Sequence, residues 1–325
     1  MKTKKTRKKE MRTAFEKYVQ RGKQFLTAEE LSMIEIRALD STDAKGGVTV
    51  PEYFANKIES AIRGSSFLDV ATVVETKAGG SLPLPTMNDS ANIGELLVEG
   101  VGIGDSADPS FNVKTFKAYT FSSKPVNISN ELVQDAPDVF FPVLAQKLAE
   151  RCVNAAVPYF INGTGVDQPL GFVTGGAKGV DAAIDSVTYN NLTALIKSVD
   201  KRFRSGASWA MNDDTLLIIQ DLKDTAGNPI IKLSYDKKGT PYLLGYPVQI
   251  INEMSDIGAG NVSIAFGNFK KYVVRLVKSM ELRRLSERYA DYNQTGFILF
   301  VRMDGNLLDI SETLSPVKYL QHAAS

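Results

Sequence analysis

The feature of this sequence that most constrains the fold is a stretch from Met87 to Ser110 with no helix or strand periodicity. Strand-like sequence flanks it: Ser81–Pro85 precedes it, and Phe111–Phe121, rich in aromatic and β-branched residues, follows it. Loops of this length are rare in compact domains and are usually functional or disordered. Because a two-stranded ribbon is barely stable alone in water, we predict an extended arm that lies on a neighbouring subunit. This feature favours an assembling protein over a catalytic one.

The size and composition of the chain predict a soluble globular protein with two lobes. Its 325 residues exceed the length at which a single hydrophobic core usually stops growing. A hydrophobic content of 43% and a charged content of 23% place it in the ordinary globular class. No apolar run approaches the roughly 18 residues that span a bilayer, and no signal-peptide core follows the basic start. We therefore expect no membrane partner.

The supply of reactive side chains argues against an enzyme. Cys152 is the only cysteine and His322 the only histidine. The single cysteine excludes a disulfide within the chain and a cysteine-based zinc site, and histidine is the usual general base near neutral pH. Cys152 falls in the apolar register of a predicted helix, so we interpret it as a core residue rather than a reactive thiol. We expect no catalytic residues, metal or cofactor.

Two motifs that superficially suggest chemistry have structural explanations. The glycines of Gly100–Asp105 follow the pattern G-x-G-x-G and precede a strand, whereas a dinucleotide loop needs G-x-G-x-x-G before a helix. We interpret them as the tip of the arm. Asp213 and Asp214 lie in the first turn of a helix capped by Asn212, where acidic side chains favour the helix dipole.

The charge of the N-terminus leaves two interpretations open. The first ten residues hold six basic residues against one acidic residue, a net charge of +5, so the remainder of this +1 chain sums to −4. The tail either contacts nucleic-acid phosphates without sequence preference or is a solvated, disordered terminus. The candidate phosphate contacts are Lys4, Lys5, Arg7, Lys8 and Lys9.

The remaining periodicity predicts an α+β protein rather than a doubly wound sheet, because helices and strands do not alternate regularly. A capping box from Thr27 to Glu30 divides the helical region 11–37 into two pieces. A long amphipathic helix is predicted over about 139–160, with Pro158 kinking or ending it. Further expected helices are 51–64, 188–203 and 212–222; expected strands are 68–74, 208–211, 243–251, 262–266, 271–277, 280–285 and 294–303.

Several segments together resemble the major capsid proteins of tailed bacteriophages, which share the Hong-Kong-97-type fold. The similar motifs occur in the family's order: Gly46–Phe54 (GGVTVPEYF), Ala71–Pro85, Phe160–Gly171, Trp209–Asn212, Leu243–Val248 and Ala265–Phe269. The resemblance implies an axial domain, a peripheral domain with a long spine helix, and an extended β-hairpin loop. The implied domains are 1–45, an N-terminal arm with the basic tail and short helices; 46–81, the start of the capsid body; 82–121, the extended loop; and 122–325, the peripheral and axial domains.

The function implied by this resemblance is a shell that assembles from pentamers and hexamers around double-stranded DNA. The implied partners are further copies of the chain, portal and scaffolding proteins and the packaged DNA, first in the host cytoplasm and then in the virion capsid. An encapsulin-like protein compartment of the same fold is the alternative. A soluble α+β enzyme and a nucleic-acid-binding module are the competing interpretations from other classes. The residues expected to contact a neighbouring subunit are Leu84, Ile93, Leu96, Val98, Phe111, Val113, Phe116, Arg283, Arg284 and Glu287.

The sequence departs from the family's pattern in its cross-linking residues and in the length of its N-terminal segment. Some family members join subunits by an isopeptide bond between a loop lysine and an asparagine, promoted by a glutamate. This chain has no lysine from Met87 to Ser110, and Phe300 aligns near the glutamate although Asn293 aligns near the asparagine, so we expect no cross-linking. The short segment before Gly46 suggests a separate scaffolding protein, or that this helical segment suffices. The charged run around Arg283, Arg284 and Glu287 is either a solvated face or an inter-subunit salt-bridge network.

Overall fold

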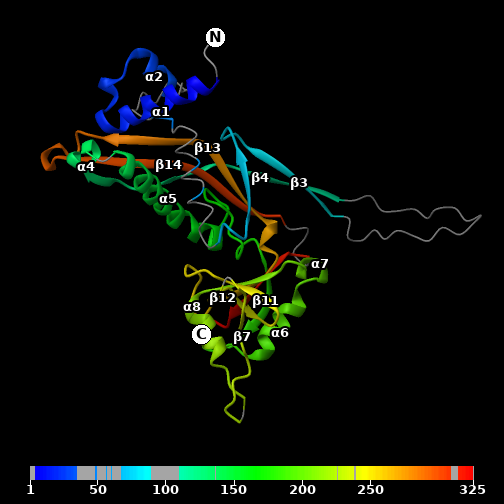
Figure 1. The fold of residues 1–325 in the computed structure, drawn as a ribbon. Coiled ribbons are helices and arrows are strands. Elements are labelled where there is room, and N and C mark those ends of the chain that lie inside the picture. The colour runs from blue at the N-terminus through cyan, green and yellow to red at the C-terminus, as the bar shows by residue number, and fades with distance from the viewer. Residues whose placement is uncertain are drawn as a thin grey trace, which may run out of the picture.

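The computed structural model describes residues 4–34, 48–49, 56, 60, 67–88, 110–135, 137–224, 226–237, 239–308 and 314–324. Two lobes, each built on one β-sheet, lie one above the other in Figure 1. A pair of helices from the N-terminus covers the upper end, and a two-stranded ribbon projects sideways from the upper lobe. The predicted α+β class is confirmed.

The upper lobe, here the α5 lobe, contains a six-stranded sheet centred on two long antiparallel strands. These are β13 (Tyr272–Leu285) and β14 (Gln294–Leu307), joined by a short turn through η3 (Ala290–Tyr292). Helices α4 (Asn130–Asp135) and α5 (Pro137–Asn162) follow the sheet's outer strands in the chain. Those strands are β1 (Val48–Thr49), β2 (Thr72–Thr76), β5 (Tyr119–Ser122) and β6 (Val126–Ser129).

Helix α5 buries one apolar face against β14 and extends past both predicted ends. Leu148, Cys152 and Phe160 on this face are fully buried. Pro158 does not end the helix, which continues to Asn162, so of the two predicted effects, a kink or an end, the end is wrong. Because Asn154 and Pro158 both lie on the exposed side, the carbonyl left without its helical donor faces solvent.

The lower lobe, here the α8 lobe, contains a seven-stranded mixed sheet in the order β7-β15-β12-β8-β11-β10-β9. Helices α6 (Tyr189–Ser198), α7 (Lys201–Arg204) and α8 (Asp213–Gln220) cover one face. Their buried leucines pack with Trp209 and Phe266 of the sheet. The strands are β7 (Ala177–Ala182), β8 (Ser208–Met211), β9 (Ser234–Tyr235), β10 (Pro241–Leu243), β11 (Tyr246–Ile250), β12 (Val262–Gly267) and β15 (Val317–His322).

A cluster of aromatic rings joins the two lobes. Because strand side chains alternate between faces, Ala210 and Ala265 point away from the α8 lobe's own helices and into the core of the α5 lobe. At the centre of this junction the Phe172 ring lies 5.2 Å from the Phe67 ring, centroid to centroid. The same ring lies 5.2 Å from Phe269, edge to face. The two lobes therefore share a continuous hydrophobic core.

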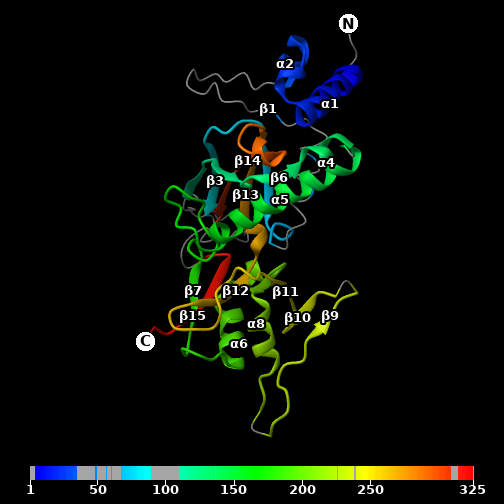
Figure 2. The ribbon, with the colours of Figure 1, turned by 90° about the vertical axis from the view of Figure 1, so that its left-hand side faces the viewer.

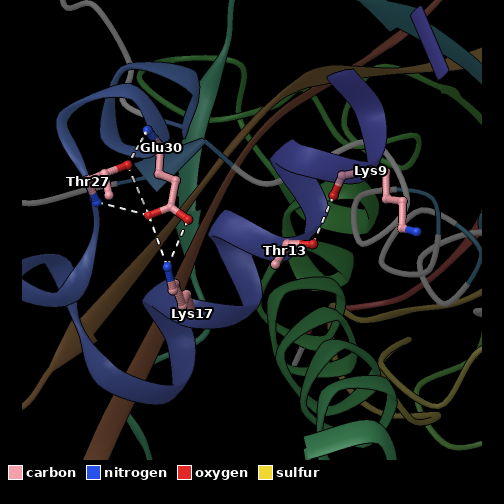
Figure 3. Close-up of polar contacts among 5 residues, drawn as sticks. All are labelled: Lys9, Thr13, Lys17, Thr27 and Glu30. Atoms are coloured by element: carbon pink, nitrogen blue, oxygen red, sulfur yellow. Dashed lines mark hydrogen bonds and ion pairs between the residues drawn. The ribbon is translucent and has the colours of Figure 1, made fainter. Parts of the chain in front are cut away.

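The N-terminal pair is α1 (Lys4–Arg21) and α2 (Ala28–Ile34), joined through η1 (Lys23–Phe25). The predicted capping box is confirmed: the Glu30 amide donates to Thr27 Oγ1 at 3.3 Å, and the Thr27 amide donates to Glu30 Oε2 at 2.9 Å. Lys17 Nζ of α1 contacts the same carboxylate at 2.9 Å, which ties the helices together (Figure 3). Arg284 Nε of β13 donates to the Val19 carbonyl at 3.1 Å, so the pair is also attached to the sheet.

Several boundaries differ from the sequence-based predictions. The region predicted as one helix over 188–203 is two helices, because Asp200 caps α7 by accepting the Arg202 amide at 2.8 Å. The strand predicted at 243–251 is a hairpin, since Leu244 and Gly245 both have positive φ, as a tight two-residue turn requires. The strands predicted at 271–277 and 280–285 form the single strand β13 with a register shift after Val277.

Other outcomes concern residues at the edges of the described ranges. The strand predicted at 68–74 begins later, at Thr72, after a turn over 67–70. Strands β7 and β15 were not predicted. The helix predicted over 51–64 lies outside the described residues except at positions 56 and 60, and the glycines of 100–104 also lie outside them.

The predicted core position of Cys152 is confirmed, and from it we predict how the thiol reacts. The thiol is fully buried beside the Leu299 carbonyl, and burial raises the pKa of the Cys152 thiol to about 12. Because the thiolate is the reactive form, native protein should resist a maleimide at pH 7, whereas urea-unfolded protein should be labelled once per chain. Mass spectrometry of both samples checks this; fast labelling of native protein would contradict it.

Candidate assembly surface

The ribbon that projects from the α5 lobe consists of β3 (Leu82–Asn88) and β4 (Ser110–Phe116). The two strands pair antiparallel in a continuous register from Leu82–Phe116 to Asn88–Ser110. They form a separate two-stranded sheet that no strand of either lobe extends. Figures 1 and 2 show the ribbon projecting from the body, and on one of its faces Pro83, Pro85, Val113 and Thr115 are exposed.

The arm ends earlier than predicted. Tyr119–Ser122 forms β5, which pairs with β14 in the six-stranded sheet, so these residues belong to the body. From here on the arm is residues 82–116. The error arose because strand sequence continues almost without a break from Phe111 to Phe121, and only tertiary pairing separates β4 from β5.

The base of the arm is held by Arg275 of β13, whose side chain is almost fully buried. Its guanidinium donates to atoms on both sides of the arm. Nε donates to Thr76 Oγ1 at 3.0 Å and Nη2 to the Ala78 carbonyl at 2.8 Å, just before β3. Nη1 donates to the carbonyls of Phe116 at 3.2 Å and Lys117 at 3.0 Å, at the end of β4.

Asp304 of β14 complements Arg275 across the sheet, where the two residues are register partners. The Lys117 amide donates to Asp304 Oδ2 at 2.6 Å, and the Gly305 amide donates to Oδ1 at 2.8 Å. Burial raises the pKa of the Asp304 carboxyl, although these amides and Arg275 act in the opposite direction. Arg275 thus binds atoms where the arm begins and where it ends, and Asp304 binds the backbone where it ends.

On the sheet face around Phe300, side chains line a pocket of about 460 Å³. Arg283 places its guanidinium carbon 4.9 Å from the Phe300 ring centroid and pairs with Glu281 at 2.5 Å. Arg302 Nη2 donates to Ser279 Oγ at 2.5 Å. Glu281 also lines the pocket, which therefore presents two guanidinium groups, one carboxylate and an aromatic ring. The excess of positive charge and the ring suit an acidic and partly apolar partner.

The structure distributes the predicted contact residues over three settings. On the arm, Val113 is 54% exposed and Leu84 is half-buried, while Phe111 lies in β4. Phe116 was a wrong prediction, because its side chain is fully buried in its own subunit. Ile93, Leu96 and Val98 lie outside the described residues.

The charged run of β13 is only partly available to a neighbour. Arg284 was predicted as a contact but is engaged within its subunit: besides Val19, its Nη2 donates to Thr295 Oγ1 at 3.2 Å. Arg283 is half-buried in the pocket beside Phe300, and Glu287 is exposed. The sequence showed the alternation of charges but could not show that an N-terminal helix covers one end of the strand.

The basic residues of the N-terminus lie in the first two turns of α1. Lys4, Lys5, Arg7, Lys8 and Lys9 are thus helical, and the interpretation of this segment as a disordered terminus is wrong. The Lys9 carbonyl accepts the Thr13 hydroxyl at 3.1 Å (Figure 3). Whether these residues meet nucleic acid stays a prediction.

The described part of the chain holds neither a metal-binding cluster nor a membrane-spanning helix. No group of three or more histidine, cysteine, aspartate or glutamate side chains there is arranged to hold a metal ion. None of the helices in the same residues combines the length and apolar character needed to cross a bilayer.

Comparison with known proteins gives a consistent picture. The profile of the phage capsid family matches residues 46–314, while no curated protein sequence matches the chain. The capsid of an empty GTA particle, determined with C5 symmetry, has a TM-score of 0.63 at 22% identity over 92% of this chain and 99% of that chain. A chain of Mycobacterium phage Cain has a TM-score of 0.58 at 13% identity over 92% and 99%.

An encapsulin is also similar, but less so. A chain of the holo-SrpI encapsulin complex from Synechococcus elongatus has a TM-score of 0.54 at 10% identity, over 78% of this chain and 85% of that chain. The capsid interpretation is therefore favoured over the encapsulin alternative. The solved structures share the Hong-Kong-97-type fold, and the family profile covers most of the sequence. The chain therefore belongs to the phage capsid family, as a major capsid protein.

Proposed function

We propose that copies of this chain form pentamers and hexamers that close into an icosahedral shell around the double-stranded DNA of a tailed phage or prophage. The observation that carries the proposal is the arm. It is a two-stranded sheet outside both lobes, and such a ribbon needs a covering surface to be stable. A neighbouring copy is the simplest source of that surface, because every subunit then supplies one arm and covers another.

The charge of the arm supports a particular binding site for it on the neighbouring copy. From Met87 to Ser110 the sequence contains five acidic residues and no lysine or arginine. The pocket around Phe300 offers Arg283 and Arg302. We propose that the acidic segment of one copy lies over this pocket of the next copy, where complementary charge fixes register and orientation.

Within a capsomer, we propose that the α5 lobe is the peripheral domain and the α8 lobe the axial domain. Leu217 and Ile218 on α8 are 56% and 48% exposed, although both are large and apolar. Adjacent exposed apolar residues are typical of a contact with another chain. The C5 symmetry of the GTA capsid is compatible with such a contact around a fivefold axis.

The remaining partners follow from the same role. We propose that the basic first turns of α1 contact packaged DNA without sequence preference, by neutralising phosphates. Assembly begins in the host cytoplasm, and portal and scaffolding proteins take part.

Contacts between basic side chains and DNA phosphates weaken steeply as salt is raised. Nuclease-protected DNA should therefore be released at lower salt from particles in which Lys4, Lys5, Arg7, Lys8 and Lys9 are replaced by glutamine than from unchanged particles.

Negative-stain imaging of the overexpressed protein, followed by analysis of the particle contents, tests the proposed function. Closed isometric shells that protect DNA from nuclease in the phage context are the expected result. Shells filled with a cargo enzyme and free of DNA would instead support the encapsulin alternative. A species that sediments as a monomer at every concentration, with or without phage partners, would contradict both.

We expect the mature shell to contain no covalent bonds between subunits. The segment that would supply a cross-linking lysine has none. Asn293 already accepts a hydrogen bond on its side-chain oxygen from Asn130 Nδ2 at 2.9 Å. Intact particles boiled in SDS should therefore give a single monomer band on a gel, whereas a ladder of larger species would refute this prediction.

A further inference from the structure

Arg275 is an unusual residue for the middle of a sheet. Its exposed fraction is 2%, and that of Asp304 opposite it is 4%. Removing two charged groups from water is costly, and apolar residues of similar size would pack in a strand at lower cost. β13 also pairs antiparallel with β14 on both sides of its register shift and parallel with β2, and these ladders do not need the two side chains. The pair therefore calls for an explanation other than stability of the sheet.

Apart from the Gly305 amide next to Asp304 in β14, the partners of this pair lie at the two ends of the arm. Thr76 and Ala78 precede β3, while Phe116 and Lys117 follow β4. A guanidinium is planar and presents its donors in a rigid fork, so it fixes the relative positions of the atoms that it binds. Asp304 adds a bond to the Lys117 amide from the other strand. One side-chain pair thus holds both ends of the arm against the same point of the body.

We propose that Arg275 is a positioning residue for assembly: with Asp304 it sets the direction in which the arm leaves the subunit. This inference rests on the proposed function, in which the arm must reach a neighbouring copy. It assigns the control of arm direction to a buried site that makes no contact with the neighbour itself.

The geometry of a lever explains why this control matters. Each arm strand has seven residues, which at about 3.3 Å per residue reach about 23 Å from the base. A tilt of about 20° at the base moves the far end by about 8 Å, twice the distance at which side chains are in contact. A small change in the tilt of the arm at its base is therefore enough to break the contacts along the whole arm.

The test measures arm direction directly in the full-length chain. Spin labels are placed on Asn112→Cys in β4, four residues or about 13 Å from the base of the arm, and on Lys147→Cys in α5, two exposed positions, while the buried native cysteine stays unlabelled. With Arg275 in place, the label-to-label distance distribution should be narrow. With Arg275→Met it should broaden or shift by about 5 Å or more, with Arg275→Lys intermediate, and shell yield should fall about tenfold in the methionine variant.

A control variant separates positioning from general loss of stability. Leu195→Ala removes a fully buried side chain in the α8 lobe, far from the arm. It should lower the unfolding temperature at least as much as Arg275→Met yet keep the narrow distance distribution. The proposal is overturned if Arg275→Met leaves the distribution unchanged, or if Leu195→Ala broadens it equally. If the labelled chain with Arg275 forms no shells at all, the proposed function fails, while the distances still test the role of Arg275.

Discussion

Replacing Ile93, Leu96 and Val98 of the arm together with aspartate should abolish shell assembly and leave the subunit folded. Full burial of each such apolar side chain contributes about 1.5–3 kcal/mol, so the triple change should remove at least about 4 kcal/mol per arm contact. That loss corresponds to roughly a thousandfold in affinity for one contact. Because a closed shell multiplies its contacts through multivalency, the loss in assembly is larger still.

Sedimentation and negative-stain imaging measure assembly, while circular dichroism and thermal unfolding report the fold. The matched control adds the same three charges to the same segment, as Ser90→Asp, Ala91→Asp and Ser106→Asp, and retains the three apolar side chains. It should assemble close to normally, because the proposed binding site of the arm holds Arg283 and Arg302, which tolerate added negative charge. Normal shells from the Ile93, Leu96 and Val98 variant would show that the arm is not an essential contact.

Phe172→Ala should destabilise the subunit by about 3–5 kcal/mol, because it removes a fully buried ring from the junction of the lobes. The ring contacts Phe67, Phe269 and Tyr272, whose centroids lie 5.2, 5.2 and 6.1 Å away. Domains of this kind have about 5–15 kcal/mol of total stability, so the variant should be largely unfolded or aggregate at 37 °C.

The midpoint of urea unfolding provides the measurement for this second prediction. Phe25→Ala, which removes a ring that is 55% exposed on η1, serves as the control and should change the free energy of unfolding by about 0.5 kcal/mol or less. Equal shifts for the two variants would contradict a shared core at Phe172. Two separate transitions in the natural sequence would contradict it as well, because lobes that share a core should unfold together.

Local sequence chemistry predicted the elements that local physics controls. The capping box that begins at Thr27 and the N-cap at Asn212 were identified from residue types a few positions apart, because the hydrogen bonds that they form span three residues. The long helix was predicted from its apolar period, and Cys152 was correctly placed on its buried face. The arm was found because its strand-like flanks enclose a stretch with no period of its own.

Where the predictions were wrong, contacts distant in sequence decided the outcome. Phe116 has the side chain of an interface residue, but its burial depends on β13 and β14, more than 150 residues away along the chain. In the sequence Arg284 is one of several charged residues in a run, and only the packing of α1 shows that its guanidinium binds the Val19 carbonyl within the subunit. The division between β4 and β5 has the same cause, because one pairs with β3 and the other with β14.

Residue types and their local pattern were enough to predict the α+β class, the presence and start of the arm, and the scarcity of reactive side chains that made an enzyme a weak interpretation. These depend on composition and on spacings of a few residues, which the chain carries whatever its tertiary fold. Only the tertiary structure revealed the junction of aromatic rings and the Arg275–Asp304 pair that holds the arm. Both bring together segments that are far apart along the chain, and a buried charge is recognisable only when its distant partners are known.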